Sequence, residues 1–156
     1  RDTYYDASAT MKGKLARLLT IIDESDKPEL DQGALQRYLA ETVWFPQALL
    51  QLQNLEWTAV DDSTALATLT DGSNPVSLHF HFDANDLVKA VSTESRYREV
   101  NGEYIPTPWR GEFSDYREVA GMLVPKKAQI IWVIDGTDVV TWRADIVSYD
   151  TSIPVD

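Results

Sequence analysis

Apolar positions recur with helical spacing in one stretch of the chain and alternate along most of the sequence after it. The helical stretch has one face whose members stand three or four residues apart. These positions are Leu35, Tyr38, Leu39, Thr42 and Val43. Asp31 is the expected N-cap, and Pro46 should end the helix near residues 44 and 45 because proline cannot continue it. Since proline suits a first helical position, a second short helix is expected over residues 47–51.

From residue 55 onward, almost every stretch predicts a strand. The seven expected strands span residues 56–60, 65–70, 76–82, 87–100, 111–119, 128–134 and 139–149. They alternate in polarity or are rich in β-branched residues, and turn sequences separate them. Such short links favour an antiparallel meander over a parallel sheet. Asn101-Gly102 is a strong hairpin signal, because both central positions of a two-residue turn favour positive φ.

Two other stretches combine opposing signals. Residues 104–116 contain Pro106 and Pro108, which restrict the start of this stretch to an edge, a bulge or a loop. The first 23 residues have helically spaced leucines, but Gly13 interrupts them and the Leu-Leu-Thr-Ile-Ile end favours a strand. We therefore expect extended structure in the later part of this opening segment.

Several expected strands carry apolar residues on both faces, as Ile131 and Val133 stand opposite Ile130 and Trp132. A sheet with one face in water alternates more cleanly, so either helices cover the second face or the sheet curves around an apolar cavity. We predict an α+β fold: a strongly curved, half-barrel-like antiparallel sheet with the helical segment, residues 34–50, packed on its concave face. Trp44 and Phe45 should then point into the space beneath.

Length and composition limit the domain organisation and the partners. The 156 residues predict a single domain, 1–156, and 44% apolar residues suffice for a core. Because the chain starts at Arg1, it is expected to be a processed form or the C-terminal part of a longer protein. The net charge of −11 argues against nucleic acid and anionic lipid surfaces. Acidic ligands would need a local basic pocket.

Several classes of site are excluded by the residues that the sequence lacks. There is no cysteine, which rules out disulfides, thiolate zinc sites and cysteine nucleophiles. There is no P-loop, GxGxxG, HExxH or GxSxG motif, and no cofactor is expected. No apolar run reaches 18 residues, so no transmembrane segment is predicted in this chain.

His79 and His81 are the only histidines and should project from one face of the same strand. Such a pair can supply two imidazoles to a metal ion, with Asp83 in the same register as a third ligand. The alternative is that all three are polar positions on the wet face of an alternating strand. No other nearby motif completes a metal site, which favours this alternative.

Arg37 and Glu41 stand four residues apart and can pair along the helix. Beneath the neighbouring aromatic residues the pair could be buried, and a carboxylate in an apolar setting can act as an acid. The alternative, which we favour, is a structural pair that holds the helix to the sheet.

Five tryptophans are many for a chain of this length. They are Trp44, Trp57, Trp109, Trp132 and Trp142. Each alone is best explained as core, whereas together with other aromatic residues they could line a hydrophobic cleft with polar groups at its rim. The residues that we select as candidate ligand contacts are Tyr38, Glu41, Trp44, Phe45, Trp109, Trp132 and Trp142.

Three runs of the sequence resemble a family of uncharacterised bacterial proteins that share a domain of unknown function. They are RYLAETVWFPQALL, LEWTAVDDSTALATLTDG and RYREVNGEYIPTPWRGEFSDYREVAGMLVP. The most specific segment, PW-x-G-x-F-x-DYR-x-x-G-x-x-x-P, contains Pro108, Trp109, Gly111, Phe113, Asp115, Tyr116, Arg117, Gly121 and Pro125. The resemblance implies no activity, so it assigns no catalytic residue.

A second resemblance is architectural. A Tyr-Arg-x-x-x-Gly-x-x-x-Pro hairpin, in a meander with helices on one face, is similar to the LolA/LolB-like lipoprotein carriers. Those proteins are curved, incomplete β-barrels whose helices close an apolar cavity, so the resemblance implies a carrier-like fold.

The sequence favours non-enzymatic binding of a hydrophobic or amphipathic ligand, such as a lipid or lipoprotein, in an exported or cell-envelope setting. One alternative is a small hydrolase or isomerase that uses Glu41 or a metal at His79 and His81. Another is a protein–protein interaction module that assembles through sheet edges or aromatic residues. The sequence leaves the oligomeric state open.

Overall fold

We analysed a computed structural model of the chain, which describes residues 2–5, 8–15, 19–25 and 27–149, with side chains from Lys27 onward. Its main feature is a sheet of seven strands, arranged in chain order with every neighbouring pair antiparallel. The strands are β4 (Leu55–Asp61), β5 (Thr64–Asp71), β6 (Asn74–Phe82), β7 (Val88–Val100), β8 (Glu103–Val119), β9 (Met122–Ile134) and β10 (Thr137–Asp145). The sheet does not close, because β4 and β10 form its two edges. The predicted seven-stranded antiparallel meander is therefore confirmed.

Tight turns join the long strands. In the turn between β7 and β8, Asn101 and Gly102 have φ of 54° and 87°, as the sequence predicted for a two-residue hairpin. Asp135 and Gly136 between β9 and β10 have φ of 51° and 74°. In both turns glycine takes the second position, where a left-handed backbone carries no steric cost.

The two prolines of β8 lie where that strand has a partner on one side only. Residues 103–107 pair with β7, whereas pairing with β9 starts at Trp109. Pro106 and Pro108 thus occupy a local edge, where a missing N–H breaks no ladder bond to β9. Of the three predicted possibilities, an edge, a bulge or a loop, the structure shows the edge, and the strand begins at Glu103 and not at Gly111.

The helical segment consists of α1 (Pro28–Glu41) and α2 (Pro46–Leu49). Our prediction of Asp31 as the N-cap was wrong, because Lys27 caps α1 and Pro28 takes its first position. Pro28 fits there since that position needs no N–H donor, and Asp31 instead adds negative charge to the first turn. At the other end, the Thr42 hydroxyl donates a hydrogen bond of 2.6 Å to the Leu39 carbonyl.

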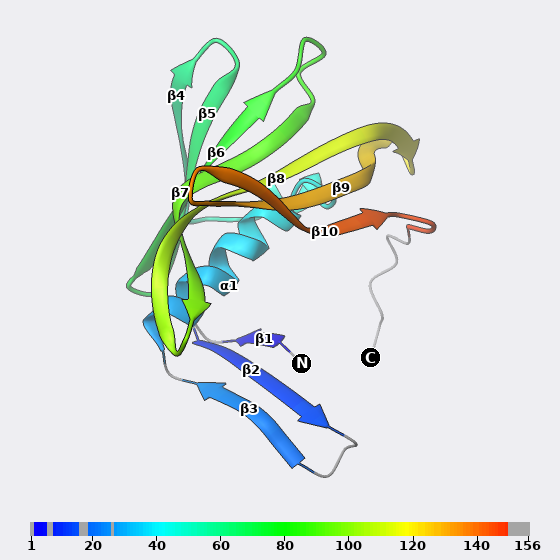
Figure 1. Cartoon of the computed structure of the whole chain (residues 1–156). Helices are drawn as coiled ribbons and strands as arrows, with labels where there is room; N and C mark the ends of the chain where they lie inside the picture. Colours follow the sequence, from blue (N-terminus) through cyan, green and yellow to red (C-terminus); the bar gives the residue numbers. More distant parts are fainter. Residues whose placement is uncertain (1, 6–7, 16–18, 26, 150–156) are drawn as a thin grey trace, which may run out of the picture.

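One face of α1 packs on the seven-stranded sheet, which arches over the helix in Figure 1. Leu35 and Leu39 of α1 are buried at 2% and 0% exposure. They join the core formed by the sheet face toward α1, which includes Leu78, Phe80 and Val91. Burial of these apolar side chains is what holds the helix on the sheet.

A smaller antiparallel sheet precedes the helix. Its strands are β1 (Asp2–Tyr5), β2 (Ser8–Leu15) and β3 (Leu19–Ser25), in that order. Both β1 and β2 contact α1, and the sheet lies below the helix in Figure 1. The predicted extended backbone in the later part of the opening segment is confirmed by β2 and β3.

Candidate functional site

A pocket of about 360 Å³ lies between the C-terminal half of α1 and strands β7–β10. We call it the aromatic pocket. Its lining residues are Arg37, Ala40 and Glu41 of α1, Trp44 of the turn that follows, Arg96 of β7, Trp109 and Phe113 of β8, Ile130 and Trp132 of β9, and Trp142 of β10. Aromatic rings and one isoleucine thus form most of its wall, and the charged side chains come from α1 and β7.

Strand register gathers the aromatic wall on the sheet face toward α1. Trp109 pairs with Trp132, and Gly111 pairs with Ile130, which in turn pairs with Trp142. Because directly opposed residues share a sheet face, the wall runs across three adjacent strands. Gly111 leaves room in it, since an added Cβ would meet Ile130 Cδ1 and Val91 Cγ2 at 3.4 Å each.

Trp44 connects the end of the helix with this wall. Its ring packs edge-on against Phe113 at a centroid distance of 5.4 Å and against Trp142 at 6.4 Å. Both geometries suit the quadrupoles of aromatic rings. The indole Nε1 of Trp44 is buried and has no acceptor among the described residues, which leaves one donor of the pocket wall unsatisfied.

Arg96 brings a cation to the pocket. One of its terminal nitrogens donates hydrogen bonds to the Gly33 carbonyl at 2.7 Å and to Gln36 Oε1 at 3.4 Å. The guanidinium lies over the Trp109 ring, 5.1 Å from its centroid, a cation–π geometry. Burial, aided by the nearby positive charge of Arg37, lowers the pKa of Arg96 to about 10, so the group stays charged at neutral pH.

Arg37 and Glu41 form the expected ion pair along α1, at 3.5 Å between Arg37 Nε and Glu41 Oε1. Both side chains are 48% exposed, so the first of the two interpretations, a buried functional pair, is wrong. The pair lies on a partly exposed side of α1, where solvent reaches both side chains. It therefore offers no apolar setting in which the carboxyl of Glu41 would act as an acid.

Five of the seven candidate ligand contacts line the aromatic pocket: Glu41, Trp44, Trp109, Trp132 and Trp142. Tyr38 lines a neighbouring hollow of about 440 Å³, which shares Arg37 and Glu41 with the aromatic pocket. Phe45 does not join either one; it is 46% exposed and stacks on Tyr149 at 5.6 Å. Phe45 is the N-cap of α2 and has a non-helical backbone, so its side chain diverges from that of Trp44.

Sequence reasoning did not select Arg96, Phe113 and Ile130 for this site, although all three line the pocket. Phe113 belongs to the PW-x-G-x-F segment, where its alternation with Trp109 was a usable signal. Arg96 had no comparable signal, because its contact with Gly33 joins residues 63 positions apart. Trp57 lies elsewhere on the sheet and packs against Phe80 at 5.0 Å.

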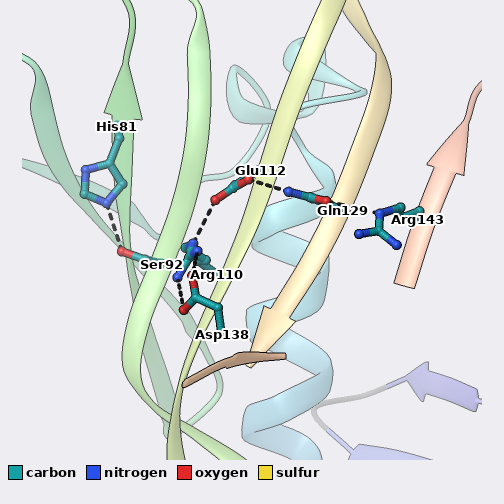
Figure 2. Close-up of polar contacts among 7 residues, drawn as sticks. All are labelled: His81, Ser92, Arg110, Glu112, Gln129, Asp138 and Arg143. Carbon is teal, nitrogen blue, oxygen red and sulfur yellow. Dashed lines mark hydrogen bonds and ion pairs between the residues drawn. The ribbon is translucent and has the colours of Figure 1, made fainter. Parts of the chain in front are cut away.

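The two histidines lie on the face of the sheet turned away from α1, which we call the outer face. Both ring nitrogens of His81 have hydroxyl partners: Nε2 with Ser92 at 2.9 Å (Figure 2) and Nδ1 with Thr64 at 3.4 Å. Burial, with nearby His79 and Lys89, lowers the pKa of His81. The carboxylate of Asp83 instead accepts hydrogen bonds from backbone N–H groups of its own turn. Within the part of the chain described, no three metal-ligating side chains cluster.

A chain of polar contacts continues across the outer face (Figure 2). Glu112 accepts hydrogen bonds from Arg110 Nε at 2.8 Å and from Gln129 at 2.6 Å, and Arg143 donates to Gln129 at 3.4 Å. Arg110 and Gln129 lower the pKa of Glu112 by stabilising its charged form. Every member has a polar partner within the chain, which is typical of a structural network.

A family model described as a family of unknown function, DUF6920, matches residues 1–150. The chain belongs to this family. The match spans both sheets, the helices and the aromatic pocket, and it confirms the expected membership of a family without an assigned function. No curated protein and no solved structure matches the chain, so no solved structure supports the resemblance to lipoprotein carriers.

Among the described residues, no helix combines the length and apolar character needed to cross a membrane.

Proposed function

We propose that the aromatic pocket binds the apolar part of a hydrophobic or amphipathic small molecule, without chemical conversion, in an exported or cell-envelope setting. One observation carries the proposal: a hollow of about 360 Å³ has tryptophans from three separate strands and the helix turn on its wall. Ligand pockets of proteins span about 300–1,000 Å³ and are lined mainly by apolar and aromatic side chains. The size suits one short acyl chain or a small ring system.

We propose further that the seven-stranded sheet has the shape of a half-barrel. An open antiparallel sheet whose concave side faces α1 would leave the pocket bounded by rigid strands on one side and by the helix on the other. The charged residues of the pocket come from the helix and β7, whereas strands β8–β10 contribute only apolar and aromatic side chains. This polarity is suited to an amphipathic molecule, with its apolar part against the sheet.

Binding should be measured through the tryptophans themselves, because four of the five line the pocket. We would titrate the protein with straight-chain alcohols of six to twelve carbons and record tryptophan fluorescence. Each added CH₂ contributes about 0.8 kcal/mol, or roughly a fourfold gain in affinity, while it finds space in the pocket. The account predicts such a gain followed by a plateau once the pocket is full.

Two tryptophans form a matched pair for this experiment. Trp142 on edge strand β10 is 46% exposed and lines the pocket, while Trp57 on the opposite edge strand β4 is 43% exposed and does not. Trp142→Ala should weaken binding of the longest alcohols at least about fivefold, whereas Trp57→Ala should leave it within about twofold. Equal losses in both variants, or no saturable binding by the wild type, would refute the proposal.

A further inference from the structure

We propose that the ligand of the aromatic pocket is an amphipathic anion with a single charged head group, such as a fatty-acid carboxylate, and that Arg96 binds that head group. The inference rests on the proposed function and adds the charge of the ligand to it. Two observations lead to it: the hydrogen bonds of Arg96 and the charge of the pocket wall.

The Arg96 guanidinium forms no ion pair with a carboxylate of the described residues, and the negative charge of Glu41 acts on it only as a nearby charge. Its two acceptors, the Gly33 carbonyl and Gln36 Oε1, are neutral, and both bind the same terminal nitrogen. Within the described residues, no carboxylate lies within ion-pair distance of Arg96, and its other two nitrogens have no hydrogen-bond acceptor. A guanidinium has five N–H donors in a planar fork that matches a carboxylate. A ligand carboxylate would occupy the unused donors.

The pocket wall is locally positive although the whole chain is acidic. Two arginines, Arg37 and Arg96, line it against one carboxylate, Glu41, while the chain carries a net charge of −11. Glu41 already pairs with Arg37 at 3.5 Å, so the charge of Arg96 is the one left for a ligand. This is the local basic pocket that an acidic ligand requires in an acidic protein.

Two neighbouring residues, Gln36 and Trp109, hold the Arg96 guanidinium in place. Gln36, which accepts from Arg96, is 1% exposed, so the guanidinium is held in place from the helix side. Trp109 holds it from the sheet side through the cation–π contact. Arg96 is thus held in place before binding, which lowers the entropic cost of recognition.

The test compares three ten-carbon amphiphiles: decanoate, 1-decanol and decyltrimethylammonium. Each is titrated below its micelle concentration at pH 8 with tryptophan fluorescence as the readout. The wild type should bind decanoate at least about tenfold more tightly than decanol, because a charge-assisted hydrogen bond to a buried cation is worth about that factor or more. The ammonium compound should bind most weakly.

Arg96→Met should weaken decanoate binding about tenfold or more and leave decanol within about threefold. Arg96→Lys should keep part of the preference, because it keeps the charge but loses the fork. Arg117→Met is the control, since Arg117 is exposed and pairs with Asp115 away from the pocket. Circular dichroism establishes that each variant is folded; if Arg96→Met is not, the wild-type and Arg96→Lys preferences decide.

The outcomes separate the two proposals. If the wild type binds decanol as tightly as decanoate, or if Arg96→Met keeps the preference for decanoate, the role of Arg96 is refuted while the apolar pocket stands. If none of the three amphiphiles binds, the proposed function fails and the inference fails with it.

Discussion

Arg110 and Asp138 join two strands that are not neighbours in the sheet. The Arg110 guanidinium on β8 donates hydrogen bonds of 2.9 Å and 2.5 Å to the Asp138 carboxylate on β10 (Figure 2). Strand β9 lies between them, and its residue Ile131 is paired in register with Arg110. Ile131 is on the outer face yet only 2% exposed, so we infer that this polar bridge shields it.

Substitutions at the bridge should separate the contribution of the buried Ile131 side chain to stability from that of the Arg110–Asp138 ion pair. Ile131→Ala should lower the free energy of unfolding by about 2–4 kcal/mol, because it removes a buried side chain and leaves a cavity. Asp138→Asn should cost clearly less, since both partners are partly exposed and salt screens the pair. Urea denaturation at low and high salt measures both. An Asp138→Asn loss as large as that of Ile131→Ala, and independent of salt, would contradict a partly exposed pair that salt screens.

Gly111 should be sensitive to added volume. Its Cβ position is bounded by Ile130, Val91 and Phe113, at 3.4, 3.4 and 3.6 Å. Gly111→Val should lower the free energy of unfolding by about 1–3 kcal/mol, because the larger side chain overpacks the wall. Gly111→Ala, with one carbon at those distances, should cost less. Thermal unfolding of the two variants checks the order, and a neutral Gly111→Val would show that the wall is looser than the structure indicates.

His81 should make stability depend on pH in a defined window. Burial first, then the charges of His79 and Lys89, lower its pKa in the folded state, so the unfolded chain takes up a proton more readily. The contribution of His81 is therefore complete above its unfolded pKa of about 6.5 and is lost as pH falls through that value toward the folded pKa. Between pH 7.5 and 5.5, the free energy of unfolding should fall more in the wild type than in His81→Gln.

His79→Gln is the control for that experiment. It removes a histidine of the same strand but keeps the burial of His81, which is the main cause of the shift. Most of the pH dependence should remain in this variant. The carboxylates with lowered pKa values, such as Glu112, titrate at more acidic pH, so they do not contribute to the change between pH 7.5 and 5.5. If His81→Gln and the wild type show the same slope, the burial of His81 does not affect stability in the predicted way.

Local patterns were sufficient to predict the seven strands, because polarity alternates with the period of the backbone and glycine marks the turns. They were also sufficient to select four tryptophans and Glu41 at the pocket. The helix start was missed because Asp31 and Pro28 are both start signals, and the proline decided the position. Local sequence patterns could not place Arg96 beside Gly33, or Arg110 beside Asp138, because those contacts depend on how distant segments pack.

The exposure of Phe45 and of the Arg37–Glu41 pair has a similar origin. Phe45 was expected to point into the space beneath the helix, and a buried Arg37–Glu41 pair was one of two interpretations, because both stand close to Trp44 in the sequence. On a helix and its following turn, however, neighbours in sequence point in different directions. Phe45 instead meets Tyr149, whose hydroxyl also donates a hydrogen bond to the Trp44 carbonyl. This contact with the end of the described chain could not be read from the helical segment alone.

The central claim, that the aromatic pocket holds an apolar ligand, is tested most directly by native mass spectrometry of protein purified from cells without detergent. We expect a mass increment of one small organic molecule per chain in the wild type and in Trp57→Ala, lost or much reduced in Trp142→Ala. A wild-type protein that carries no such molecule, and that gains none when incubated with decanoate or decanol, would contradict it.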